Sequence, residues 1–281
     1  MKFLRYGPAG QEKPGCLDED GNIRDLSGAI GDFAGRTVSL EALGRLKALD
    51  TNSLPIVEGS PRIGPCLAWV PNFICVGLNY AKHAAETGAN IPKEPIIFSK
   101  LTSALSGPFD PVIIPKTSEQ TDWEVELGVV IGKTASYVSE ADALSYVAGY
   151  CTINDVSERS FQKDRGGQWI KGKSAPSFGP TGPYLVTADE VSDPQNLSLT
   201  LSVNGDVQQN SSTSDMIFTV AQVISHLSQF MELRAGDIIA TGTPEGVGMG
   251  NKPPKFLKAG DVMSLEVEGL GRQEQTVQDH S

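Results

Sequence analysis

Cysteine is scarce in this chain of 281 residues, which has only four cysteines. They stand at positions 16, 66, 75 and 151, and no two of them form a C-x-x-C pair. This spacing argues against a zinc knuckle and against a dithiol redox motif. We therefore expect four reduced thiols, mostly buried in or beside strands.

Long apolar runs and basic clusters are also missing. No apolar run approaches the ~18 residues of a membrane-spanning helix, and the start, MKFLRYGPAGQEK, lacks the apolar segment of a signal peptide. The net charge is −11, without a dense group of Lys and Arg, so nucleic acid and membranes are excluded as expected partners. We expect a cytoplasmic protein that binds divalent cations and small molecules.

Turn-forming residues are abundant, because 30 glycines and 18 prolines separate many short segments. The β-rich ones after residue 73 are FICVG, IIFSK, PVIIP, WEVELGVVIG, VAGYCTIND, PYLVT, LSLTLSVNG, DIIATG and DVMSLEVEG. Helical patterns occur in SLEALGRLKAL, SEADALSYV and MIFTVAQVISHLSQFMEL. With TNSLPIVEGSPRIGP as a linker, we predict an α+β, mainly β chain with a small N-terminal domain (residues 1–65) and a larger domain (66–281).

The segment WEVELGVVIG at residues 123–132 alternates apolar residues with two glutamates. In a strand, Glu124 and Glu126 point away from the apolar face, toward solvent or toward a site, and solvent is the commoner case. A site is favoured by Gly128, which continues the glutamate face, and by Asp155, which ends the strand-like run AGYCTIND. Three converging carboxylates would make an oxygen-only site suited to Mg²⁺ or Mn²⁺.

Histidine occurs only three times. His83 and Glu86 are three residues apart in GLNYAKHAAETG, so a short helix would place them on one face. A carboxylate that fixes the tautomer of an imidazole suits it to act as a general base, whereas the alternative is an ordinary surface pair. We assign His226 to packing or solvent in an amphipathic helix, and His280 to a disordered tail.

Two glycine-rich stretches carry further polar groups. DVSERSFQKDRGGQWIKGKSAPSFGPTGP contains Lys171 and Lys173, and an ammonium beside a metal would stabilise an enolate or oxyanion. ATGTPEGVGMG superficially resembles a nucleotide loop, but NKPP follows it in place of a helix, and no G-K-[ST] is present. We interpret it as a strand-end turn whose Thr243 hydroxyl and backbone N–H groups receive a carboxylate.

Six stretches, in this order over residues 73–250, resemble the fumarylacetoacetate hydrolase superfamily. They are GLNYAKHAAE, FSKLTSALSGP, DWEVELGVVIGK, INDVSERSFQ, KGKSAPSFGPTGPYLVT and AGDIIATGTPEGVG. The run GGQWIKGKS is most similar to a subgroup of ureidoglycolate lyases and 2,4-diketo-3-deoxy-sugar-acid hydrolases. The resemblance implies the family's mixed β-sandwich roll behind a small N-terminal domain, usually as a homodimer.

The resemblance also implies roles for individual residues, carried over position by position. These are the Mg²⁺ (or Mn²⁺) ligands Glu124, Glu126 and Asp155, the catalytic dyad His83 and Glu86, the active-site lysine Lys173, and the substrate contacts Thr243, Arg159, Gln162 and Lys100.

The reaction implied is metal-dependent hydrolysis of a carbon–carbon bond in a 2,4-diketo acid, which gives pyruvate and a second acid. Alternatives on the same scaffold are a ureidoglycolate lyase, an oxaloacetate decarboxylase and a 2-hydroxyhepta-2,4-diene-1,7-dioate isomerase, and a non-catalytic binding protein is a further alternative. If Ile170 and the pair Ala175 and Pro176 line the pocket, they make it less polar than in the subgroup. That would favour an intermediate of aromatic degradation as substrate.

Overall fold

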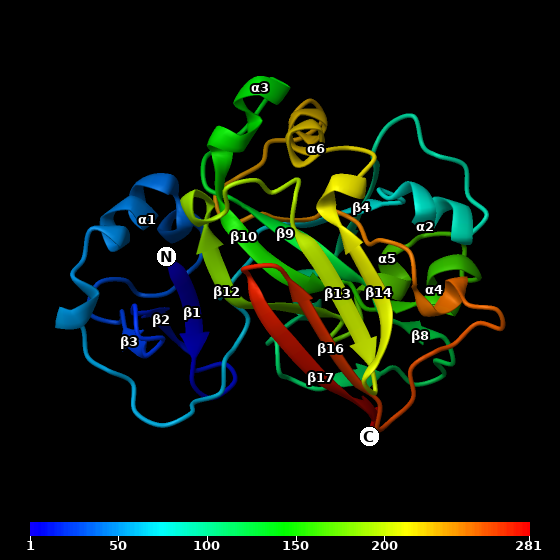
Figure 1. Ribbon diagram of the computed structural model, residues 1–281, viewed down its shortest axis with the longest axis horizontal. Helices are drawn as coiled ribbons and strands as arrows, with labels where there is room; N and C mark the ends of the chain where they lie inside the picture. The colour runs from blue at the N-terminus through cyan, green and yellow to red at the C-terminus, as the bar shows by residue number, and fades with distance from the viewer.

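The computed structural model describes all 281 residues and consists mainly of strands, as predicted. Ten strands form one mixed sheet (Figure 1). From edge to edge they are β3 (Ile23–Asp25), β2 (Lys13–Leu17), β1 (Lys2–Tyr6), β12 (Gly179–Thr187), β10 (Val147–Asn154), β9 (Val125–Ile131), β15 (Ile238–Ala240), β4 (Phe73–Gly77) and β5 (Ile96–Lys100), with β6 (Leu105–Ser106) paired to β12.

A second sheet of five strands packs on the first. Its order is β14 (Asp206–Ser212), β13 (Ser198–Val203), β16 (Val262–Val267), β17 (Gly271–Asp279) and β7 (Val112–Ile114). β8 (Thr121–Asp122) and β11 (Ser157–Glu158) form a separate pair. Apolar residues of both large sheets, such as Leu127 and Leu265, share one core, so the architecture is a sandwich of the expected kind.

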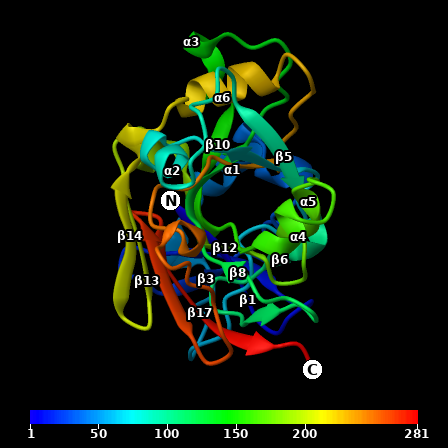
Figure 2. The ribbon, with the colours of Figure 1, turned by 90° about the vertical axis from the view of Figure 1, so that its right-hand side faces the viewer.

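The α-helices are all short and lie around the sheets. They are α1 (Leu40–Lys47), α2 (Ala81–Glu86), α3 (Glu140–Ala143), α4 (Arg159–Lys163), α5 (Ile170–Lys173) and α6 (Val220–Leu227). Helices α2, α4 and α5 lie on the right in Figure 1, and Figure 2, which looks at that side, shows α2 across from α4 and α5. No helix has the length and apolar character needed to cross a membrane.

Helix starts follow the expected capping chemistry, but one helix end does not follow its apolar pattern. The hydroxyls of Ser39 and Ser139 accept hydrogen bonds from backbone N–H groups at the starts of α1 and α3. Helix α6 stops at Leu227, although the apolar spacing of MIFTVAQVISHLSQFMEL continues, and the hydroxyl of the next residue, Ser228, donates to Ser225 O and accepts from the N–H of Val138. Phe230, which continues the apolar spacing, lies beyond the helix and is 67% exposed.

Strand β9 is buried on both faces, and the two faces differ in kind. Val125 and Leu127 belong to the larger core between the sheets, which confirms the predicted apolar face. On the opposite face, Gly128 lies against Cys151 and Ile153 of β10, where a Cβ atom would clash with both side chains. The face of β9 that carries Glu124 and Glu126 is therefore polar before Gly128 and part of the packed core from Gly128 onward.

The N-terminal strands continue the main sheet. β1 pairs antiparallel with β12, and Phe3 and Phe33 share a second core with Phe73 of β4. All four cysteines are free and buried in this second core, as expected from their spacing. The domain boundary at residue 65 stays a prediction.

Several strands were not apparent from the sequence, among them β14 and β17, and His280, which we expected in a disordered tail, directly follows the last strand. Strand β17 runs to Asp279 and pairs with β16 and β7. Its alternate buried positions include Gln273 and Gln275, whose amides donate to backbone carbonyls. Polar residues on the inner face hide the usual apolar alternation of a strand.

Replacing Val125 by Asp should destabilise the protein by about 4 kcal/mol or more, because it buries an unpaired charge. Val125 is fully buried, whereas Val207 in β14 is 66% exposed, so Val207→Asp is the matched control and should change stability by less than about 0.5 kcal/mol. Urea unfolding measures both. Equal stability of the two variants would contradict the assignment of the β9 faces.

Candidate metal and active site

Three carboxylates converge at the ends of two neighbouring strands. Glu124 directly precedes β9, Glu126 lies within it, and Asp155 directly follows β10. The N–H of Asp155 donates to Glu124 O over 2.9 Å, which extends the strand pairing to these residues. Carboxylate oxygens of the three residues lie within 4.8 Å of one another, and all three residues are buried. An oxygen-only set of this size fits a hard divalent cation.

Cations of the chain itself offset two of these carboxylates. Arg159 Nη2 lies 2.7 Å from Glu124 Oε1. Lys173 Nζ bridges Glu124 Oε2 at 2.7 Å and Asp155 Oδ2 at 2.6 Å. Burial opposes ionisation of Glu124, but Lys173 and Arg159 overcome it and hold the pKa of this carboxyl well below its usual range. Glu124 is therefore a stable anion.

Glu126 is the carboxylate of the three that forms no ion pair with a cation of the chain. Its Oε2 accepts a hydrogen bond of 2.8 Å from the N–H of Gly242, and no Lys or Arg nitrogen lies within 4.0 Å of it. Burial and the charges of Asp155 and Glu124 raise the pKa of Glu126 well above its usual range. A divalent cation held between the three residues would supply the charge that this position lacks.

Lys100 lies behind the carboxylates and not among the residues that line the cavity. Its ammonium is 2.5 Å from Asp155 Oδ1 and donates to the carbonyl oxygens of Val156 and Lys173. Burial lowers the pKa of Lys100, although the ion pair with Asp155 favours the charged form. In this structure Lys100 orients Asp155, and its implied contact with substrate stays a prediction.

His83 and Glu86 form a hydrogen-bonded pair on α2. His83 Nδ1 lies 2.7 Å from Glu86 Oε1, and the other oxygen of Glu86 accepts a hydrogen bond of 2.9 Å from the N–H of Gly246. His83 is 6% exposed and lines the cavity, which distinguishes the pair from an ordinary surface contact. Because Nδ1 faces Glu86, the tautomer with a proton on Nδ1 leaves Nε2 free to accept one.

Asp122 connects Arg159 to the glycine-rich loop. Its Oδ1 accepts from the N–H of Gly248 at 2.7 Å, and its Oδ2 accepts from the N–H of Met249 at 3.0 Å and from Arg159 Nε at 2.8 Å. Sequence reasoning missed this fully buried residue. The signal was present, because Asp122, Glu124 and Glu126 share the same two-residue period.

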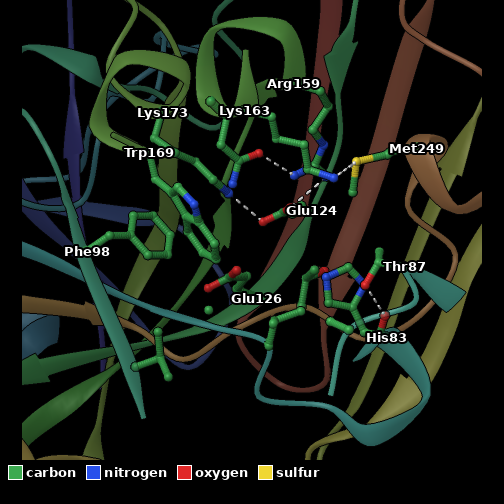
Figure 3. Close-up of a pocket in the computed structure, with 16 residues that line it drawn as sticks. His83, Thr87, Phe98, Glu124, Glu126, Arg159, Lys163, Trp169, Lys173 and Met249 are labelled. Atoms are coloured by element: carbon green, nitrogen blue, oxygen red, sulfur yellow. Dashed lines mark hydrogen bonds and ion pairs between the residues drawn. The ribbon is translucent and has the colours of Figure 1, made fainter. Parts of the chain in front are cut away.

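A cavity of about 180 Å³ lies over the carboxylates. This volume is below the ~300 Å³ at the lower end of sites for drug-sized ligands, so it suits a small acid. In Figure 3, Phe98 and Trp169 lie on one side of it and Met249 on the other. The rings of Phe98 and Trp169 have centroids 5.2 Å apart at 61°.

Most of the predicted site residues meet at this cavity. Of the predicted site residues, those that line it are His83, Glu124, Glu126, Arg159, Gln162, Lys173 and Thr243. The Thr243 hydroxyl donates to Val125 O and accepts from Gln209 Nε2, so its role as a substrate contact stays a prediction. Ile170 and the pair Ala175 and Pro176 do not line the cavity, so they cannot set its polarity as expected.

Known proteins share sequence and fold with this chain. Residues 72–278 match the family model described as the C-terminal domain of fumarylacetoacetate (FAA) hydrolase. A relative from Burkholderia lata, named only as a hydrolase, is 60% identical over 280 residues, which cover 99% of each chain.

Solved structures with several activities share the fold. A fumarylacetoacetate hydrolase from Exiguobacterium antarcticum has a TM-score of 0.89 at 34% identity, with complete coverage of both chains. A maleylpyruvate hydrolase from Sphingobium sp. SYK-6, in complex with manganese(II) and pyruvate, has a TM-score of 0.82 at 29% identity and complete coverage. A 2-hydroxyhepta-2,4-diene-1,7-dioate isomerase from Mycobacterium marinum has a TM-score of 0.76 at 29% identity, with coverage of 100% of this chain and 99% of that one.

Replacing Glu126 by Gln should leave the metal-free protein at least as stable as wild type at pH 7. The amide oxygen can still accept from Gly242, and the substitution removes a carboxyl whose raised pKa disfavours folding once pH exceeds its unfolded value. Any rise in Tm on addition of Mg²⁺ or Mn²⁺ should disappear. Thermal unfolding with metal and with EDTA checks this, with Glu58→Gln on the surface as control. A metal-induced rise equal to that of wild type would remove Glu126 from the ligand set.

Proposed function

The chain belongs to the fumarylacetoacetate hydrolase family, and from this premise we propose that it hydrolyses a carbon–carbon bond in a 2,4-dioxo acid, with pyruvate and a second acid as products. One observation carries the proposal: a carboxylate triad and a carboxylate-held histidine face the same small cavity. The manganese and pyruvate bound to the similar maleylpyruvate hydrolase support the class of metal and of product.

The triad of Glu124, Glu126 and Asp155 would hold Mg²⁺, or Mn²⁺ in its place, because the donor set consists of oxygen alone. When bound, the ion supplies Lewis acidity toward the 2-oxo group of the substrate. Glu124 and Asp155 already have cationic partners. Glu126 has none, and a bound metal ion would supply the missing positive charge, which supports this assignment.

His83 is the proposed general base. Its Nδ1 faces Glu86, so Nε2 takes a proton from water, and the water oxygen adds to the carbonyl at C4 of the substrate. The bond between C3 and C4 then breaks, and its electron pair stays on C3 as the enolate of pyruvate. The proton taken by His83 balances the one that C3 receives. The ammonium of Lys173 lies close enough to the carboxylates to stabilise the enolate charge.

An isomerase is the second candidate, and the similarity to the isomerase from Mycobacterium marinum favours it. The same carboxylate floor and Lys173 would stabilise an enolate during a double-bond shift. Such a reaction moves a proton between carbon atoms and needs no water addition. It should therefore depend less on the pair of His83 and Glu86.

The two functions are separated by products. The protein should convert acylpyruvates to pyruvate and a second acid with Mg²⁺ or Mn²⁺, and it should lose this activity with EDTA. In water labelled at its oxygen atom, the label should appear in the carboxylate of the second acid. Conversion of a hydroxymuconate-type diacid to its isomer, without label and without pyruvate, would replace the hydrolase by the isomerase.

Replacing His83 by Ala should lower kcat for hydrolysis about a hundredfold to ten-thousandfold, because the base that activates water is lost. Metal binding should be retained, since His83 is not part of the triad. Steady-state kinetics and isothermal titration calorimetry measure the two effects. His226→Ala is the matched control, because that histidine lies on α6 against Phe230. Near-normal hydrolysis by the His83 variant would reject the histidine as base.

A further inference from the structure

One cation at the cavity is not neutralised by the protein. Three Lys or Arg side chains line the cavity, and two of them, Arg159 and Lys173, form ion pairs with buried carboxylates. Lys163, the last residue of α4, has no carboxylate oxygen within 4.0 Å. Its Nζ meets only Met249 Sδ, at 2.9 Å.

The surroundings of Lys163 favour an anion beside it. Partial loss of solvation at the cavity rim and the positive charge of Arg159 lower the pKa of Lys163, and the charges of Asp164 and Asp122 offset this only in part. A carboxylate placed next to the ammonium would form a charge-assisted hydrogen bond and relieve this imbalance. A thioether sulfur is only a weak acceptor, so Met249 does not take that role.

Apolar side chains line the same cavity as the carboxylates and Lys163. They include Val76, Leu78 and the aromatic pair of Phe98 and Trp169. Trp169 is fixed in place because its ring lies directly on Gly77, where a Cβ atom would clash with it. These apolar surfaces suit a short chain of carbon atoms.

We propose that Lys163 binds a second, terminal carboxylate of the substrate, so that the protein prefers diacids with a 2-oxo acid head over the corresponding monoacids. The head would be held at the carboxylate floor, the carbon chain would pass between the aromatic pair and Met249, and the far carboxylate would meet Lys163. This inference rests on the proposed function only in requiring that a 2-oxo acid binds at the floor. It names the substrate class as a 2,4-dioxo diacid.

Two stable ligands of equal length test the preference without turnover. 2-Oxoheptanedioate and 2-oxoheptanoate differ only in a terminal carboxylate against a methyl group, and neither has the 4-oxo group that cleavage requires. Calorimetry with Mg²⁺ at constant ionic strength should give wild type a Kd about tenfold lower for the diacid, as one charge-assisted hydrogen bond implies. Repeating the pair with six and eight carbon atoms removes the dependence on chain length.

Variants assign the preference to one side chain. Lys163→Met should reduce the diacid preference to less than about twofold, and Lys163→Glu should reverse it through like-charge repulsion. Lys163 is exposed at the cavity rim, so both variants should fold, which their Tm verifies. Lys116→Met, at an exposed lysine on the turn after β7 that does not line the cavity and forms no ion pair, should keep the wild-type preference.

Each outcome decides between the proposals. Equal binding of the two acids by wild type, or a preference that persists in Lys163→Met, would overturn the role of Lys163 while leaving the 2-oxo acid site in place. Binding of neither acid would overturn the 2-oxo acid site and the proposed function with it. A diacid preference that Lys163→Met abolishes, in a protein that cleaves no 2,4-dioxo acid, would retain the role of Lys163 and reject the hydrolase.

Discussion

The burial of several carboxylates side by side is the constraint on which the site depends. An ionised carboxylate in a protein interior costs several kcal/mol unless cations or hydrogen-bond donors surround it. The chain meets this requirement from segments far apart in sequence. α4 and α5 deliver Arg159 and Lys173, and the end of β5 delivers Lys100. The two helices approach closely because Gly172 has no side chain to collide with Glu158 O and Gln162. The polar surroundings therefore fix the positions of the carboxylates before any ligand arrives.

The glycine-rich loop after β15 extends this constraint to the histidine. Its backbone N–H groups donate to three separate carboxylates, one from the triad, one behind the histidine and one behind the arginine, which are Glu126, Glu86 and Asp122. Backbone donors hold anions with little freedom of movement, since they carry no rotatable side chain. A single segment thus sets the positions of the floor, the histidine and the arginine relative to one another. Displacement of the loop would disturb all three together.

The sequence predicted the parts of this site that rest on local periodicity or on motif order. The two-residue alternation of β9 correctly placed Val125 in the core and Glu126 on the opposite face, and the spacing of His83 and Glu86 correctly placed them together. The surroundings of Lys100 could not be predicted, because they depend on how the end of β5 passes beneath Asp155 in the folded chain. Strand β17 was missed because Gln273 and Gln275 occupy positions where apolar residues are expected.

The floor and the rim of the cavity differ in how tightly the fold holds them, and this difference explains how one scaffold supports several reactions. Glu124 and Asp155 each contact two cations, so a change there alters stability and chemistry together. Lys163 contacts a single methionine sulfur, so replacing it removes little that holds the fold. A change at the rim can therefore alter which ligand fits while the floor keeps its ion pairs. A maleylpyruvate hydrolase and a 2-hydroxyhepta-2,4-diene-1,7-dioate isomerase have this fold, as expected where a fold keeps its architecture and changes the groups that surround its site.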